Sequence, residues 1–359
     1  MPNLRLRMLL RGLMLLAALV ITLPAQGTDR AEPLLPLPPA LEGFLRASVP
    51  NFVFPHESDL PFTLPAAIAG TGETNSTCEL PEGFDLNGPR AVPGTVNPVI
   101  SLAPGVTTSI GQSDRGLGRR PHAVVTITTD LSMDGARAIV DLDYHAIRKN
   151  GRFRWTLAER EIAFARLLAD GSVGYVGESP EEIELEDGGR RNRIKTGGKV
   201  EARDAWLDGR QHAKGGLIMP GTVAPGEPFL VGHAPTVEFE DCSQIVSVDL
   251  RQCLLSTGDC YDNVVVVVEW DPADDLGVAQ IKYYANGDVI KVSSLKDPEG
   301  EELEQVLARD LMPDELVWAR AVAHHLYRTA RVKRQALFAD APPLVQDPPH
   351  LPPPPPVMP

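Results

Sequence analysis

Carboxylate and imidazole side chains alternate in one short run of the chain, at Asp141, Asp143 and His145. Alternate residues of a β-strand project from the same face, so an extended backbone would place these three groups side by side. Because carboxylates and imidazoles are common metal ligands, this run is the best nucleus for a metal site in the sequence. An ordinary polar strand face is the simpler interpretation, and we assign no metal ligand.

The other histidines add little to the case for a metal. His324 and His325 are adjacent on a segment with helical spacing, where neighbours point roughly 100° apart and cannot chelate one ion as an i, i+4 pair could. His122, His212 and His233 are isolated within the region predicted to form a sheet. We interpret all of them as structural or surface residues and expect no cofactor.

Glu269 is the carboxylate that we would test first for acid–base catalysis. It follows a run of five valines and precedes Trp270. Glycoside hydrolysis needs two facing carboxylates. The chain has 48 acidic residues, so the sequence does not favour any one of them as the partner of Glu269. A cross-strand ion pair between Glu269 and Lys282 is the simpler prediction.

A serine nucleophile has no support in the sequence. The GxSxG elbow of serine hydrolases is absent. The nearest match, from Gly171 to Gly174, lacks the required glycine spacing and lies in a predicted hairpin turn. We therefore assign no catalytic, cofactor-binding or metal residue.

Antiparallel strands must position these side chains. The β-branched run 123–129 and the alternating run 138–144 flank a turn at 133–135, and the tyrosine-rich run after Trp270 turns at Asn286-Gly287. Further strands are predicted at 162–168, 173–176, 199–206, 229–232, 245–254, 263–270, 280–285 and 288–293. About ten strands indicate a mainly β (α+β) fold, with one large curved antiparallel sheet and one C-terminal amphipathic helix.

The composition divides the chain into five zones. They are a signal peptide (1–27), a Pro/Gly-rich arm (28–96), the antiparallel β domain (97–310), the amphipathic helix (311–338) and a disordered Pro-rich tail (339–359). In the first zone, three arginines precede about 12 apolar residues, too few to span a membrane. We therefore expect an exported protein, periplasmic or extracellular, without a stable membrane span after cleavage.

The net charge narrows the range of partners. Removal of residues 1–27 takes three arginines and no acids from a chain of net charge −14, which leaves about −17. Such a surface repels phosphate groups, so we expect no binding to nucleic acid. The basic run 190–195 follows the acidic run 181–187, and we interpret it as a solvated loop between strands.

Four cysteines in an exported chain permit two disulfides in three pairings. We favour Cys253 with Cys260, because they flank LLSTGD, a sequence typical of a hairpin connection. Cys78 would then pair with Cys242 and tie the N-terminal arm to the core.

Several blocks of the chain resemble a family of exported bacterial proteins without established activity. The blocks are NPVISLAPG (97–105), LADGSVGYVGE (168–178), WLDGRQHAKGGLIMPGTVAPGEPF (206–229), YDNVVVVVEWDP (261–272) and QIKYYANGDVIKV (280–292). The chain departs from the family at Gly174-Tyr175, where the family has Trp-Tyr, at 274–276, and at the shorter turn 286–288. More remotely, the YYAxG ending is similar to curved half-barrel sheets of envelope proteins that cradle acyl chains.

These observations favour an exported, non-catalytic binding or envelope-associated protein that holds an apolar ligand on a curved sheet. The valine run 264–268 is apolar on both faces and must be covered on both, by the helix on one side and by core, arm or ligand on the other. A closed core without a cavity is the simpler structure. The alternative function is a secreted hydrolase with an unrecognised carboxylate site.

Overall fold

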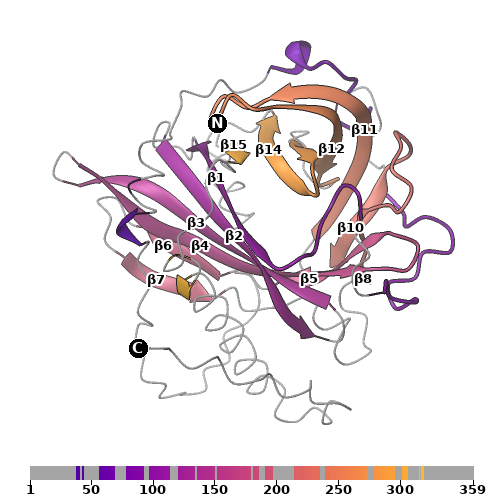
Figure 1. The fold of residues 1–359 in the computed structure, drawn as a ribbon, viewed down its shortest axis with the longest axis horizontal. Coiled ribbons are helices and arrows are strands. Elements are labelled where there is room, and N and C mark those ends of the chain that lie inside the picture. Colours follow the sequence, from indigo (N-terminus) through magenta and orange to yellow (C-terminus); the bar gives the residue numbers. More distant parts are fainter. Residues whose placement is uncertain are drawn as a thin grey trace, which may run out of the picture.

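The computed structural model shows a mainly β protein built on one large curved antiparallel sheet (Figure 1). It describes residues 38–40, 43, 56–68, 78–92, 97–113, 120–133, 136–149, 152–178, 181–185, 191–196, 214–234, 239–272, 279–295, 301–305, 315 and 317–318. Most of the predicted strands lie in these ranges. The predicted signal peptide, the Pro-rich tail and the predicted strand 199–206 lie outside them.

Among the described residues, fifteen strands make up the sheet. They are β1 Gly105–Ser113, β2 Arg120–Met133, β3 Ala136–Lys149, β4 Arg152–Leu167, β5 Val173–Glu178, β6 Glu181–Leu185, β7 Arg191–Thr196, β8 Lys214–Gly215, β9 Leu217–Met219, β10 Phe229–Ala234, β11 Phe239–Cys253, β12 Cys260–Trp270, β13 Ala279–Ala285, β14 Asp288–Leu295 and β15 Glu301–Gln305. One short 3-10 helix, η3 Glu57–Asp59, lies in the arm.

The strand order shows how the sheet curls. The main path is β7-β6-β4-β3-β2-β1-β15-β14-β13-β12-β11-β10-β8, and β5 pairs with both β4 and β9. Only Gly216 separates β8 from β9, and its carbonyl accepts a hydrogen bond from the Tyr175 N–H at 2.9 Å. A second route of strand pairing therefore links β4 to β10, through β5 and the β8–β9 segment.

Glycine is required where the two sides of the sheet meet. A Cβ at Gly216 would overlap the carbonyl oxygens of Leu230 and Val231, and one at Gly215 would overlap the carbonyl oxygen of Tyr175. Only a residue without a side chain lets β5 and β10 approach this closely. The Lys-Gly-Gly sequence at 214–216 thus has a structural reason.

The convex face of the sheet is dry. Val264, Val266, Val268 and Ile281 point to this face and have at most 1% exposure. Side chains of the arm cover them, among them Leu60, Phe62, Leu64, Ala67 and Ile68. On β2 and β3 the same face carries Val125, Val140 and Leu142, which are also buried.

The other face of the valine run packs at one end of the sheet's interior. Val265, Val267 and Tyr284 form a cluster with Val99 and Leu102, which belong to the segment 97–104. Asn97 holds this segment: its side-chain amide donates to the Gly171 carbonyl at 2.5 Å, and its Oδ1 accepts from the Val99 and Ile100 N–H groups. The valine run is thus covered on both faces, by the arm on one and by the segment 97–104 and the interior cluster on the other. The helix that was predicted to cover one face lies almost entirely outside the described residues.

The structure confirms both expected disulfides. Cys78 and Cys242 join the arm to β11, with Cα atoms 5.8 Å apart. Cys253 and Cys260 face each other at the end of the β11–β12 hairpin. The tyrosine hairpin turns at Asn286-Gly287, as predicted, and both residues have positive φ.

The basic run 190–195 was wrongly interpreted as a loop, because residues 191–196 form β7. This strand pairs with β6, and the register places Glu182 opposite Lys195 and Glu184 opposite Arg193. Opposite charges in directly facing positions favour the pairing of two strands. The predicted helix 311–338 lies almost entirely outside the described residues, of which Glu315, Val317 and Trp318 are helical.

Candidate functional site

Charged and polar side chains lie on the concave face of the sheet, next to the apolar interior cluster. Register places Lys282 and Tyr284 of β13, Glu269 of β12, and Asp141 with Thr126 of β3 and β2 on this face. We call these five residues the concave-face cluster. They come from strands that lie on both sides of the curve, and only the curling of the sheet brings them together.

Asp141 is the most perturbed acid of the concave-face cluster. Burial raises its pKa to about 6, against the opposing effects of the Thr126 hydroxyl, which donates a hydrogen bond at 2.5 Å, and of Lys282. Asp143 and Asp288 add like charge and raise the pKa further. Asp141 is therefore a carboxyl group that exchanges its proton near neutral pH.

Lys282 forms an ion pair with Glu269, which confirms the pairing predicted from the sequence. Burial lowers the pKa of Lys282, but the charge and hydrogen bond of Glu269, together with Tyr284 and Asp241, more than offset this effect, so the pKa lies above its ordinary value. The second carboxylate oxygen of Glu269 accepts a hydrogen bond from the Ser243 hydroxyl at 3.2 Å. Glu269 is thus fixed from two neighbouring strands.

Tyr284 lies beside Lys282 on the same face of β13 and is 5% exposed. Burial raises the pKa of its phenol to about 12, so the hydroxyl keeps its proton at physiological pH. It is therefore available as a hydrogen-bond donor rather than as a base. Its ring belongs to the apolar cluster that the segment 97–104 completes.

The three residues named as the best nucleus for a metal site are only partly described. Asp143 contacts His122 of the neighbouring strand. His145 lies opposite His122 in the register, and its side chain is outside the described part of the structure. Among the described residues, no group of three or more His, Cys, Asp and Glu side chains is placed to hold a metal ion. Residues His212, His324 and His325 lie outside the described ranges.

Ser172 has a structural role. Its hydroxyl donates to Asp170 at 3.0 Å and accepts from the Gly221 N–H at 3.0 Å, in the turn between β4 and β5. With 5% exposure and both neighbours engaged, it lacks the access that a nucleophile needs. This agrees with the absence of an elbow motif in the sequence.

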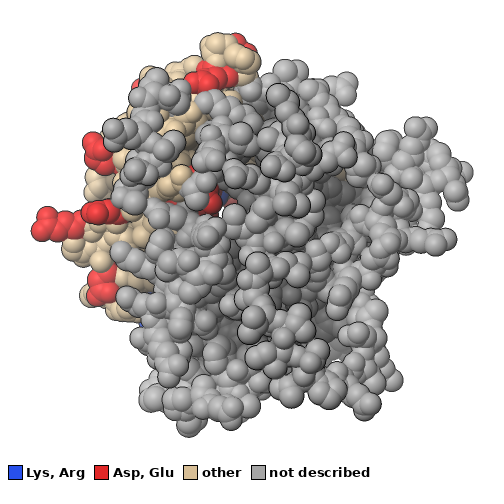
Figure 2. Space-filling model, turned by 180° about the vertical axis from the view of Figure 1, so that it is seen from behind, with Lys and Arg blue, Asp and Glu red and all other residues tan. Residues whose placement is uncertain are grey.

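Carboxylate side chains gather at one edge of the face that Figure 2 shows. They are drawn in red, and little blue lies among the described residues. This distribution fits the net charge of −14. A polyanion such as nucleic acid would meet repulsion over this part of the surface.

Comparison with known proteins gives no information about the concave-face cluster. No family model, curated protein or solved structure matches this chain. The resemblance to exported bacterial proteins therefore stays a prediction. No described helix has both the length and the apolar character needed to cross a lipid bilayer.

Sequence reasoning identified members of the site but not their assembly. Asp141, Glu269 and Lys282 were singled out, whereas Tyr284 and Thr126 were not. Thr126 could have been found from strand pairing, because the predicted turn at 133–135 brings the run 123–129 alongside the run 138–144. The approach of Asp141 to Lys282 has no local signal in the sequence.

Proposed function

We propose that this chain is an exported, non-catalytic binding protein that holds a small molecule on the concave face of its sheet. One observation carries the proposal. Register places Asp141 and Lys282 on the concave face, and the Lys282 and Glu269 side chains keep 26% and 18% exposure. Water therefore reaches charged groups on this face of the sheet.

The exposure pattern along the strands supports a binding face. Ile139, Asp141 and Val292 point inward and are each partly exposed, whereas the outward residues Val140 and Leu142 are buried to 0% and 1% exposure. In a plain closed core the inward residues would be the dry ones. A ligand on this face would replace the water that now reaches these groups.

The lining favours an amphiphilic ligand over a purely apolar one. Ile139, Val289 and Val292 offer apolar surface, while Glu269, Lys282 and Asp141 offer charge and hydrogen bonds nearby. A small number of polar groups beside apolar side chains is the usual composition of a small-molecule site. The apolar part of the ligand would lie on the valines and isoleucine, and its polar part would lie against the charged groups.

The binding function can be tested on the purified protein. Native mass spectrometry should find a co-purifying small molecule that organic extraction removes, and the stripped protein should bind the apolar fluorophore N-phenyl-1-naphthylamine. Ile139→Trp should weaken this binding at least tenfold, because the larger side chain fills the face. Val92→Ser, at a site with 73% exposure, is the matched control and should bind normally. A clean mass without fluorophore binding would exclude the proposal.

Export is part of the proposal and has its own test. The arginines and apolar run of residues 1–27 predict signal cleavage, and two disulfides are favoured in an oxidising compartment. The mature protein should begin near Gln26 or Thr28 and fractionate outside the cytoplasm. A full-length chain retained in the cytoplasm would contradict export.

A secreted hydrolase is the second candidate, and one observation favours it. Asp141, whose pKa lies at about 6, could act as a general acid at neutral pH, with Glu269 as the second carboxylate of the same interior. A broad ester and glycoside screen tests this activity. Turnover that Glu269→Gln and Asp141→Asn both abolish would favour the hydrolase over the binding protein.

A further inference from the structure

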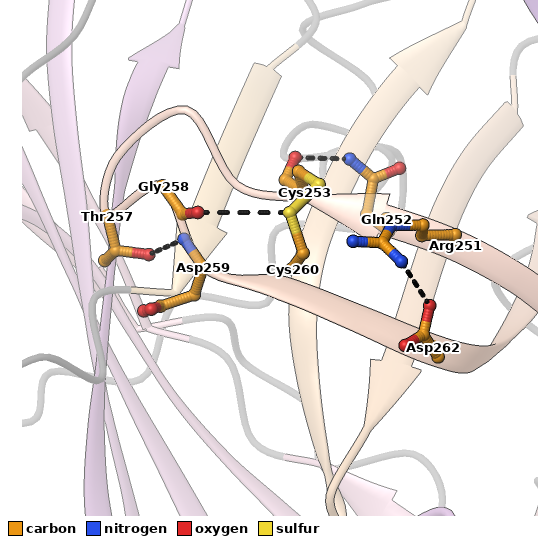
Figure 3. The surroundings of a disulfide bond; sticks show 8 residues. All are labelled: Arg251, Gln252, Cys253, Thr257, Gly258, Asp259, Cys260 and Asp262. Carbon is orange, nitrogen blue, oxygen red and sulfur yellow. Dashed lines mark hydrogen bonds and ion pairs between the residues drawn. A yellow bond between two sulfur atoms is a disulfide. The ribbon is translucent and has the colours of Figure 1, made fainter.

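The Cys253–Cys260 disulfide lies at the exposed end of the β11–β12 hairpin (Figure 3). The two cysteines are direct cross-strand partners, and both are exposed. They enclose a loop with a sequence separation of 7, whereas Cys78 and Cys242 are separated by 164 residues and are 9% and 0% exposed. The chain therefore holds one accessible disulfide and one buried disulfide.

The hairpin turn has its own hydrogen bonds and does not depend on the sulfur bridge. The Leu254 N–H donates to the Asp259 carbonyl at 2.8 Å, and the Gly258 N–H donates to the Leu254 carbonyl at 2.9 Å. The Asp259 N–H donates to the Thr257 hydroxyl at 3.1 Å. The Leu254 side chain is buried among the apolar residues on the convex face of the sheet. Opening the disulfide would thus leave the turn in place.

The carboxylates of Asp259 and Asp262 and one guanidinium, that of Arg251, lie near the exposed disulfide, so the net charge around it is negative. Asp259 is exposed beside Cys260. Two residues after Cys260, Asp262 of β12 forms an ion pair with Arg251 of β11 at 3.2 Å. Figure 3 shows these carboxylates on either side of the sulfur atoms. Negative charge repels an anionic thiol and favours a neutral or cationic one. The surroundings therefore select among possible reductants.

We propose that Cys253–Cys260 is a thiol-exchange site, reduced by a dithiol without added negative charge while the protein stays folded and Cys78–Cys242 stays oxidised. A thiolate of the dithiol attacks one hairpin sulfur, forms a mixed disulfide and releases the other cysteine as a thiolate, which takes up a proton. The second thiol of the dithiol, after losing its proton, attacks the mixed disulfide. The products are two protein thiols and the oxidised dithiol, a transfer of two electrons and two protons.

The experiment treats the folded protein with dithiothreitol and follows each cysteine by timed alkylation and peptide mapping. Cys253 and Cys260 should be alkylated at least 100-fold faster than Cys78 and Cys242, with unchanged circular dichroism, and oxidised dithiothreitol should restore the bridge. Reduction of both disulfides at one rate would overturn the proposal. So would reduction that occurs only with loss of structure.

A separate measurement tests which class of thiol reduces the hairpin disulfide. Cysteamine should reduce the hairpin disulfide at least fivefold faster than 2-mercaptoethanesulfonate at low salt, and the double variant Asp259→Asn, Asp262→Asn should narrow this ratio. Glu227→Gln removes an exposed carboxylate before β10 and should leave the ratio unchanged. Equal rates for the two thiols in the unaltered protein would overturn the assignment of the donor.

Discussion

Asp141 on β3 and Lys282 on β13 interact electrostatically across the concave face of the sheet. Five strand-to-strand steps separate them along the sheet, a path of about 24 Å at the usual spacing. Their interaction therefore requires the sheet to curl until its two sides face each other. The charged interior is a product of curvature, and its properties report on whether the curved structure is intact.

The pH dependence of stability should reflect Asp141. Its pKa rises from 3.8 to about 6 on folding, so its contribution to stability is fully present below about pH 4 and is lost as the pH rises through 6. From pH 4.5 to 7.5 the loss is about 2 kcal/mol. Asp141→Asn should remove this loss, as measured by urea unfolding at both pH values. Parallel pH profiles for the variant and the unaltered protein would contradict the assignment.

Breaking the interior ion pair should destabilise the fold. Glu269→Gln leaves the ammonium of Lys282 without its carboxylate in a largely buried position, at a cost of about 3 kcal/mol in the free energy of unfolding. The double variant Glu269→Gln, Lys282→Met should recover much of this loss, because no charge is then left buried. Denaturant titrations of the three variants form the double-mutant cycle.

The chain offers a matched control for this cycle. Arg251 and Asp262 also form a cross-strand ion pair, at 3.2 Å, but their side chains are 68% and 67% exposed. Asp262→Asn should change stability by less than about 1 kcal/mol. Equal losses at the two pairs would show that Lys282 is not shielded from solvent.

Local patterns were sufficient to predict most strands and pairings near in sequence. The run 138–144 alternates, the valine run is β-branched, and Asn286-Gly287 has the residues that a tight hairpin turn requires, so each choice is made within a few residues. The pairing of Glu269 with Lys282 follows from the same hairpin geometry. These features depend on neighbours along the chain.

Features that depend on distant pairing could not be predicted. The meeting of β5 with β10 at Gly216 joins segments whose approach is set by the curl of the whole sheet. The strands β6 and β7 were missed because the acidic run and the basic run look like solvated segments when taken singly, and the register that places Glu182 opposite Lys195 is visible only when both strands are aligned. The approach of Asp141 to Lys282 was missed because it too depends on the curl of the whole sheet.

Gly216→Ala should destabilise the sheet by about 3 kcal/mol or more. The added Cβ would overlap two backbone carbonyl oxygens, and backbone cannot move aside as a flexible side chain can. Gly226→Ala is the control, because its nearest neighbour would lie at an ordinary 3.8 Å. Thermal and urea unfolding of the two variants measure the difference. Similar stabilities would mean that β5 and β10 do not meet as closely as the structure shows.

Asn97→Ala should destabilise the protein by about 3 kcal/mol and expose the apolar end of the interior. The variant loses the hydrogen bond to the Gly171 carbonyl and leaves the Val99 and Ile100 N–H groups without their acceptor, in a position with 2% exposure. Because Val99 and Leu102 follow directly, their packing against Tyr284 should loosen. Urea unfolding measures the first effect, and faster amide hydrogen exchange at residues 99–102 measures the second. Asn87→Ala, at an exposed turn whose side chain makes none of these contacts, should change neither quantity, and equal exchange rates in the two variants would show that Asn97 does not hold the segment.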